Sequence, residues 1–189
     1  MPAQYRPHVL GIDDGPFDKF ESETTPIVGV MMEGADLVEA VAITAFPVDG
    51  EDVTPFLADW IENLRFRPAL QGILLGGITI AGLCVVDALQ LAQRVRLPVV
   101  ITNRREPSDE PLRRALHAAG LPDRIPIVDH SPRPFRLTSG LYAALAGESR
   151  QWAEKLLRST RAKSDLPEPL RLAHMIARAI ASGESRGRP

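Results

Sequence analysis

The stretch that most constrains the fold is residues 9–15, Val-Leu-Gly-Ile-Asp-Asp-Gly. Its apolar residues predict a short buried strand, and its C-terminal end presents two adjacent carboxylates, Asp13 and Asp14, to solvent. Neighbouring side chains on a strand point to opposite faces. Both carboxylates can therefore face one site only if the chain bends, which Gly15 and Pro16 would allow. The stretch is compatible with a metal-binding carboxylate and also with an ordinary Asp-Gly turn.

Length and composition predict one globular domain. The chain has 189 residues, of which 44% are hydrophobic and 24% charged, so we expect a domain over residues 1–182 and a disordered tail over 183–189. The net charge of −2 excludes a general polycation, so nucleic acid would need a local basic patch or metal ions. A single cysteine, Cys84, excludes an internal disulfide, and its apolar neighbours favour a buried structural thiol. Without an evident signal peptide or membrane span, we expect a cytoplasmic protein with no membrane partner.

The hydrophobic pattern predicts three consecutive strands followed by alternating helices and strands. The expected strands are 9–15, 26–32, 37–46, 70–75, 97–102 and 125–128, with a further extended segment at 135–144. The expected helices are 51–64, 81–95, 108–119, 147–159 and 168–181. This order predicts an α/β fold with a mixed sheet of about five strands, in which an antiparallel three-strand meander joins parallel strands and helices cover both faces.

Four motifs resemble those of one family. They are residues 11–17 (Gly-Ile-Asp-Asp-Gly-Pro-Phe), 77–87 (Gly-Ile-Thr-Ile-Ala-Gly, then Val-Val-Asp), 97–100 (Leu-Pro-Val-Val) and 167–174 (Pro-Glu-Pro-Leu-Arg-Leu-Ala-His). In this order they resemble the uncharacterised, mainly archaeal family called domain of unknown function ninety-nine, which is similar to endonuclease V. The resemblance implies a ribonuclease H-like fold and Mg²⁺-dependent cleavage next to deaminated purines. The strand order expected above agrees independently with that fold.

Carried over position by position, the resemblance implies an incomplete catalytic set. Asp13 stands where endonuclease V has the Asp that ends its first strand, and Asp49 stands where a Glu ends the third. Residues 76–79 align with an Asp-Gly-His-Gly motif but lack the acid, and Leu141 stands where a late His follows a glycine. The resemblance therefore implies Asp13 and Asp49 as catalytic residues and as ligands of Mg²⁺ or Mn²⁺. We expect the two to lie close together, because the first and third strands would be neighbours in the meander.

Further candidates for the site also have structural interpretations. Asp14 could supply another metal ligand, as could Asp87, which could equally be a polar residue in the first turn or middle of a helix. His174 could donate a proton or contact phosphate, or it could help the Pro-Glu-Pro segment to pack, the interpretation slightly favoured. Arg104 and Arg105 follow a strand end, where α/β folds bind ligands, and are the best candidates for contacts with nucleic-acid phosphates.

Three functions are compatible with these residues. The first is an endonuclease V-like, metal-dependent hydrolysis of phosphodiesters in DNA or RNA. The second is a catalytically impaired protein that binds nucleic acid or a nucleotide in the same cleft, which the missing acid and the missing His favour. The third is an enzyme that acts on a small molecule, although no residue singles out a substrate. A fold does not decide among them; convergence of Asp13, Asp49 and a third carboxylate in one cleft would favour the nuclease.

Overall fold

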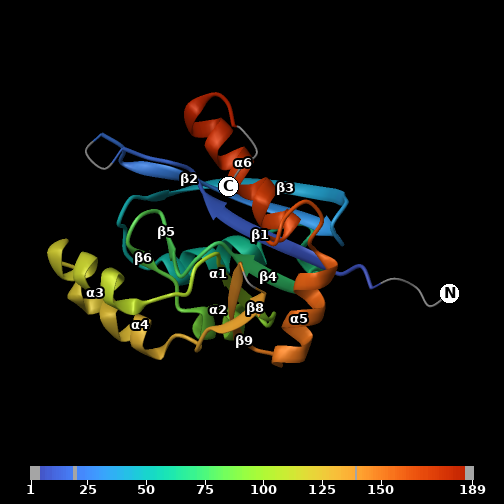
Figure 1. Ribbon diagram of the computed structural model, residues 1–189. Coiled ribbons are helices and arrows are strands. Elements are labelled where there is room, and N and C mark those ends of the chain that lie inside the picture. The colour runs from blue at the N-terminus through green and yellow to red at the C-terminus, as the bar shows by residue number, and fades with distance from the viewer. Residues whose placement is uncertain (1–4, 19–20, 139, 186–189) are drawn as a thin grey trace.

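A seven-stranded mixed sheet forms the centre of the computed structural model, which describes residues 5–18, 21–138 and 140–185 (Figure 1). The strand order is β3-β2-β1-β4-β7-β9-β8. These strands are β1 (His8–Asp14), β2 (Thr24–Glu33), β3 (Leu37–Pro47), β4 (Gly72–Leu75), β7 (Val99–Asn103), β8 (Phe135–Thr138) and β9 (Leu141–Ala146). A separate hairpin pairs β5 (Thr79–Ile80) with β6 (Cys84–Val85).

Strand directions confirm the predicted combination of a meander with parallel strands. Strands β1, β2 and β3 pair antiparallel in succession. Strand β4 runs parallel to β1 and to β7, and the β8–β9 hairpin closes the other side in antiparallel pairing. The expectation that the first and third strands are neighbours was wrong, because β2 lies between them.

Helices cover both faces of the sheet, as expected. They are α1 (Val53–Glu62), α2 (Ala88–Val95), α3 (Asp109–Ala118), α4 (Ile125–His130), α5 (Arg150–Ser159) and α6 (Glu168–Ser182), with 3-10 turns at Arg67–Ala69 and Pro122–Arg124. Helices α1 and α2 pack on one face through Leu57 and Leu91, and α5 and α6 pack on the other through Leu156 and Leu170. Helices α3 and α4 pack against the β5–β6 hairpin in a separate apolar cluster.

Three segments differ from the sequence-based expectation. Residues 125–128 belong to helix α4 rather than to a strand; Pro126 lies in its first turn, where proline favours a helix start. The expected helix over 81–95 begins only at Ala88, because Ala81 and Gly82 have positive φ angles and form the turn between β5 and β6. The expected extended segment 135–144 contains two strands, with residues 135–138 in β8 and 141–144 in β9. Of the expected tail, residues 186–189 lie outside the described residues.

Within residues 5–18, 21–138 and 140–185, no helix combines the length and the apolar character that crossing a membrane would require.

Helix α6 packs closely on β1 because residue 11 is glycine. A Cβ atom at Gly11 would lie 2.4 Å from the carbonyl carbon of Pro169, so only a hydrogen at this position admits the α6 backbone. The buried Glu168 fixes the same end of the helix: Arg171 Nε donates to it at 2.8 Å, and the backbone N–H of Lys163 donates at 3.2 Å. The Pro-Glu-Pro segment therefore anchors the start of α6 to β1 and to the preceding loop.

We expect Gly11→Ala to lower the free energy of unfolding by about 1–3 kcal/mol, because the added methyl group must push the α6 backbone away from β1. Urea denaturation followed by circular dichroism measures the change. Gly140→Ala is the matched control: its Cβ would meet only the end of the exposed Asp165 side chain, at 3.2 Å, and should shift stability by no more than about 0.5 kcal/mol. Equal unfolding midpoints for the Gly11 variant and the native protein would contradict the close packing.

Candidate functional site

Asp13 of β1 and His174 of α6 form the central contact of the candidate site. The Nδ1 atom of His174 lies 2.9 Å from Oδ2 of Asp13. Strand alternation turns Asp13 towards α6, since its cross-strand partner Val28 packs against that helix while the preceding Ile12 packs on the opposite face. With its proton on Nδ1, the imidazole donates to the carboxylate, which fixes the ring and leaves Nε2 for another partner.

Asp14 points to the opposite face of β1. Its Oδ2 accepts a hydrogen bond from the backbone N–H of Ala81 at 2.7 Å. Burial, followed by the negative charge of Asp13, raises the pKa of Asp14 to about 6. The two neighbouring carboxylates therefore repel each other in a partly dehydrated environment, and a nearby cation would relieve that repulsion.

Gly76, the residue after β4, lies directly against the Asp13 carboxylate. A Cβ atom at Gly76 would lie 3.2 Å from Oδ1 of Asp13, which is a tight contact. The resemblance to endonuclease V assigns an acid to this position, and here the side chain is a hydrogen. Asp13 and Gly76 line the same cleft, and a side chain at residue 76 would require Asp13 to shift.

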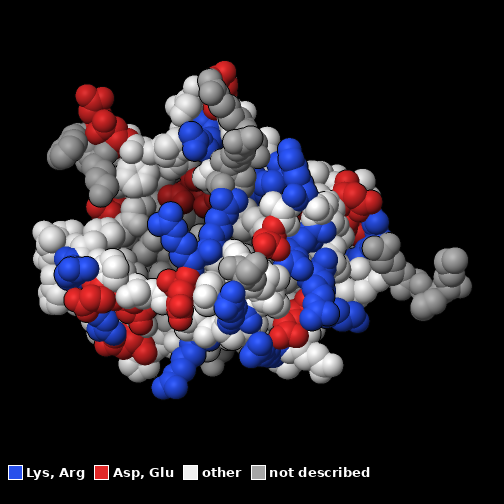
Figure 2. Space-filling model, viewed as in Figure 1, with Lys and Arg blue, Asp and Glu red and all other residues white. Residues whose placement is uncertain are grey.

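A cleft of about 430 Å³ brings Asp13 and His174 together with Arg104 and Arg105. The two arginines follow β7, whose end lies beside the end of β4 in the sheet. Figure 2 shows acidic side chains in a hollow that Lys and Arg side chains border. The structure thus places the predicted phosphate-contact residues in the same cleft as the predicted catalytic Asp13.

A second, adjoining hollow of about 400 Å³ shares Gly76 and Asn103 with the cleft. Its lining includes Gly77, Leu112, Pro132 and Pro134. Polar and apolar groups share its lining, as in pockets where polar groups orient a small ligand.

Asp49 makes contacts that hold the turn after β3 in place. Its Oδ1 accepts from the backbone N–H of Leu83 at 2.6 Å, and its own N–H donates to the carbonyl of Ala81 at 2.9 Å. Buried Arg124 donates to the carbonyls of Asp49 and Gly50 at 2.7 and 2.8 Å. These contacts tie the turn after β3 to the β5–β6 hairpin. That Asp49 shares a metal ion with Asp13 stays a prediction.

Asp87 is the N-cap of α2. Its Oδ1 accepts from the backbone N–H of Gln90 at 2.9 Å, which satisfies one of the free donors at the helix start. This contact supports the structural interpretation of Asp87, which lines a different hollow from the one that Asp13 lines.

The single cysteine, Cys84, is buried, and burial raises the pKa of its thiol to about 11.

Two residues of the region were not singled out from the sequence. Arg124 lies in a short stretch of mixed character, and no spacing pattern connects it to Asp49, 75 positions away. Asn103 lies at the end of β7, next to Arg104, and lines both hollows. Its place at a strand end, directly before the two arginines, is the signal that could have identified it.

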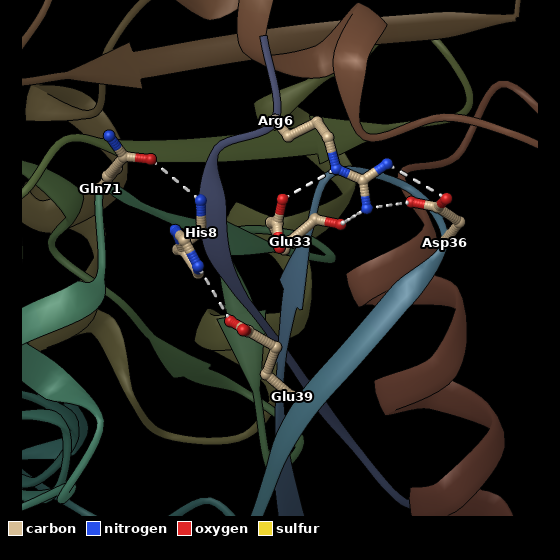
Figure 3. Close-up of polar contacts among 6 residues, drawn as sticks. All are labelled: Arg6, His8, Glu33, Asp36, Glu39 and Gln71. Atoms are coloured by element: carbon tan, nitrogen blue, oxygen red, sulfur yellow. Dashed lines mark hydrogen bonds and ion pairs between the residues drawn. The ribbon is translucent and has the colours of Figure 1, made fainter. Parts of the chain in front are cut away.

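A second polar cluster lies at the opposite end of β1, six residues or about 20 Å from Asp14. Figure 3 shows His8 beside Glu39, with Nε2 and Oε2 3.1 Å apart, and Arg6 bound to Glu33 and Asp36. Among the described residues, ligand atoms of His8, Glu33 and Glu39 are the one group of three that lies within 4.8 Å of one another. Arg6 and His8 already face these carboxylates, so the cluster is a salt-bridge network that joins β1, β2 and β3.

Comparison with known proteins gives consistent matches along the chain. A family model described as endonuclease dU matches residues 6–181. A UPF0215 protein from Thermococcus sibiricus is 40% identical over 184 residues, with 94% of each chain covered. The crystal structure of a protein of unknown function from Archaeoglobus fulgidus is 32% identical, with a TM-score of 0.85 and coverage of 93% of this chain and 98% of that one.

Endonuclease V is a more distant structural neighbour. The Ciona intestinalis enzyme, solved with a DNA containing an inosine followed by a ribo-adenosine, is 14% identical with a TM-score of 0.55, covering 89% of this chain and 82% of that one. This likeness concerns the fold, and it confirms the ribonuclease H-like architecture. From the family match and the Thermococcus relative together, the chain belongs to the endonuclease dU family, built on the fold of endonuclease V.

Proposed function

We propose that this protein is a metal-dependent nuclease that hydrolyses phosphodiester bonds near a deaminated nucleoside, which is deoxyuridine in DNA. The observation that carries the proposal is the Asp13–His174 pair in one cleft with Arg104 and Arg105. The family description, endonuclease dU, supports deoxyuridine. The inosine-containing DNA bound to the Ciona enzyme supports a deaminated base more generally.

The cleft fits one hard divalent ion at Asp13. Mg²⁺ uses one or two carboxylates and completes its coordination with waters and substrate phosphates. Asp13 offers a carboxylate in the lining of the cleft, and Asp14 adds negative charge nearby. Both oxygens of Asp13 already have one partner, the N–H of Asp14 at Oδ1 and His174 at Oδ2, so an ion would use their remaining lone pairs. A pair of ions would need further carboxylates. When bound, Mg²⁺ or Mn²⁺ would polarise the phosphate and acidify a water.

The protein's own residues divide the remaining tasks. His174 holds the Asp13 carboxylate in one orientation through its 2.9 Å contact, and it carries a proton close to the reaction centre. Arg104 and Arg105 present fixed positive charge to the phosphates of the strand. The adjoining hollow at Gly77 and Leu112 would offer both apolar and polar groups to an extruded base.

A second candidate function is binding without cleavage. Gly76 favours it, because the resemblance to endonuclease V implies an acid at this position and loss of a metal-binding carboxylate weakens both the position of an ion and the activation of its water. The arginines and the adjoining hollow would retain the nucleic acid in either case. Cleavage and binding assays on the same strands separate the two functions.

For the nuclease we expect Asp13→Asn to reduce cleavage of DNA containing one deoxyuridine by about 100-fold or more, because the amide cannot replace the carboxylate as a metal ligand. Denaturing gels with Mg²⁺ or Mn²⁺ measure the rate, and calorimetric titration with Mn²⁺ measures the loss of ion binding. Asp59→Asn, a change at an exposed carboxylate on α1, should leave both unchanged. Cleavage by the Asp13 variant at the rate of the native protein would refute the nuclease proposal. If the native protein slows the strands in a native gel but does not cleave them, binding is the function.

For nucleic-acid contact we expect the double variant Arg104→Ala/Arg105→Ala to weaken binding about equally for strands with and without deoxyuridine. The slope of log K against log[salt] should fall by about two units, since about one counterion is released per neutralised phosphate. Fluorescence anisotropy across a salt series measures this slope. Arg94→Ala/Arg114→Ala removes two exposed arginines that do not line the cleft and should change it little. An unaltered slope in the cleft variant would assign phosphate contact to other residues.

A further inference from the structure

We propose that the protein forms a symmetric dimer in which β3 pairs, antiparallel, with β3 of a second copy. Strand β3 is the last strand on its side of the sheet, so one row of its backbone N–H and C=O groups has no partner strand. Such an edge is a template for pairing with another chain. The inference is independent of the nuclease proposal, because it uses none of the residues of the cleft.

The usual protections of an edge strand are missing from the middle of β3. Proteins blunt edges with lysines, prolines, bulges or short strands. Strand β3 has 11 residues, and residues 40–46, Ala-Val-Ala-Ile-Thr-Ala-Phe, contain no charge, proline or glycine. An exposed edge segment that is apolar and has high β-propensity promotes aggregation unless another chain or element packs on it.

The exposed side chains of β3 extend an existing apolar cluster. Val41 and Ile43 pair with Val30 and Val28 of β2, and those valines pack beneath α6. Paired residues on neighbouring strands share a face. Val41 and Ile43 are nevertheless 45% and 56% exposed, because α6 covers β1 and β2 and leaves β3 open.

The single charge in β3 turns away from this face. A register shift between Met31 and Met32 inserts Glu39 as an extra residue in β3, and such bulges redirect a side chain. Figure 3 shows the result: Glu39 faces His8 on β1, 3.1 Å away, rather than the open edge. The bulge and the inward-turned Glu39 protect the first part of β3, and residues 40–46 remain the part of the edge that can pair.

Self-complementarity favours a second copy over another protein. A twofold axis at Ala42 places Val41 opposite the partner's Ile43, and Ile43 opposite the partner's Val41, on the face beside α6. On the other face it places Ala40 opposite the partner's Thr44. Shifting the axis by one residue, to Val41, would instead oppose Ile43 to the partner's Glu39. The axis at Ala42 thus pairs apolar residues with apolar residues twice.

The surface is large enough for a dimer. The exposed apolar residues of β3 are Leu37, Val38, Val41 and Ile43. Together they offer on the order of 300 Å², within the range of the largest apolar patch on a typical monomer. The strand edge itself, about 36 Å long, adds backbone area, which brings the total towards the roughly 800 Å² per partner of a standard interface.

Solution mass tests the proposal. Light scattering after size exclusion should give twice the 20.7 kDa of one chain for the native protein, and 20.7 kDa for Val41→Lys/Ile43→Lys, because lysines would oppose each other across the axis. Leu89→Lys changes a residue of similar exposure, 47%, on α2, and should remain a dimer. A native mass of one chain at tens of micromolar, or a dimer that persists in the double lysine variant, would overturn the proposal.

Cross-linking tests the register. Cα atoms directly opposite in an antiparallel pair lie about 4.5–5.5 Å apart, within the range of a disulfide. With oxidised glutathione as the oxidant, Ala42→Cys should therefore give a covalent dimer, whereas Ala45→Cys, three residues from the axis, should not. The native chain, whose one cysteine is the buried Cys84, gives the background level of cross-linking. Cross-linking at 45 without cross-linking at 42 would refute the axis at Ala42.

Discussion

The close approach of the α6 backbone to β1 at Gly11 is the constraint on which the candidate site depends. With a hydrogen at this position, Pro169 can rest on the strand, and the buried Glu168 holds the helix start in place. His174 then lies one and a half turns further along α6, level with Asp13, two residues along β1. The contact between His174 and Asp13 is therefore a consequence of backbone packing. This explains why the Pro-Glu-Pro motif and the Gly-Ile-Asp-Asp motif occur together in one chain.

Residue patterns predicted the mixed sheet and the two faces of helices, because long periodic segments such as 26–32 and 37–46 leave little ambiguity. They failed where a run was short: Ile125, Ile127 and Val128 have β-branched side chains, yet Pro126 begins a helix there. At the site, Asp13, Arg104 and Arg105 could be identified from their places at strand ends. The contact of His174 with Asp13 joins residues 161 positions apart, and no local pattern contains such a contact.

Asp49 has structural contacts in addition to the role that the resemblance implies for it. It lies at the end of the third strand, as the resemblance implies, but β2 separates that strand from β1. Its φ of 54° is unusual for a residue other than glycine, and the N–H of Leu83 and the guanidinium of Arg124 surround it. These contacts support the hairpin on which Ala81 offers its N–H to Asp14. Asp49 thus acts on the cleft through the backbone that holds Asp14.

The charges of the cleft link ion binding to protonation. Burial and the charge of Asp13 raise the pKa of Asp14 to about 6, so its proton binds more tightly in the folded protein than in the unfolded chain. A cation beside Asp13 favours the ionised form of Asp14 and lowers that pKa. Under the proposed function, binding of the ion and release of the proton would be reciprocal, so affinity for a divalent ion would fall as the pH drops below about 6. Gly76 lines the cleft beside Asp13 without a side chain of its own, so the charges of Asp13 and Asp14 would attract the ion, and the nearby arginines would attract the phosphates.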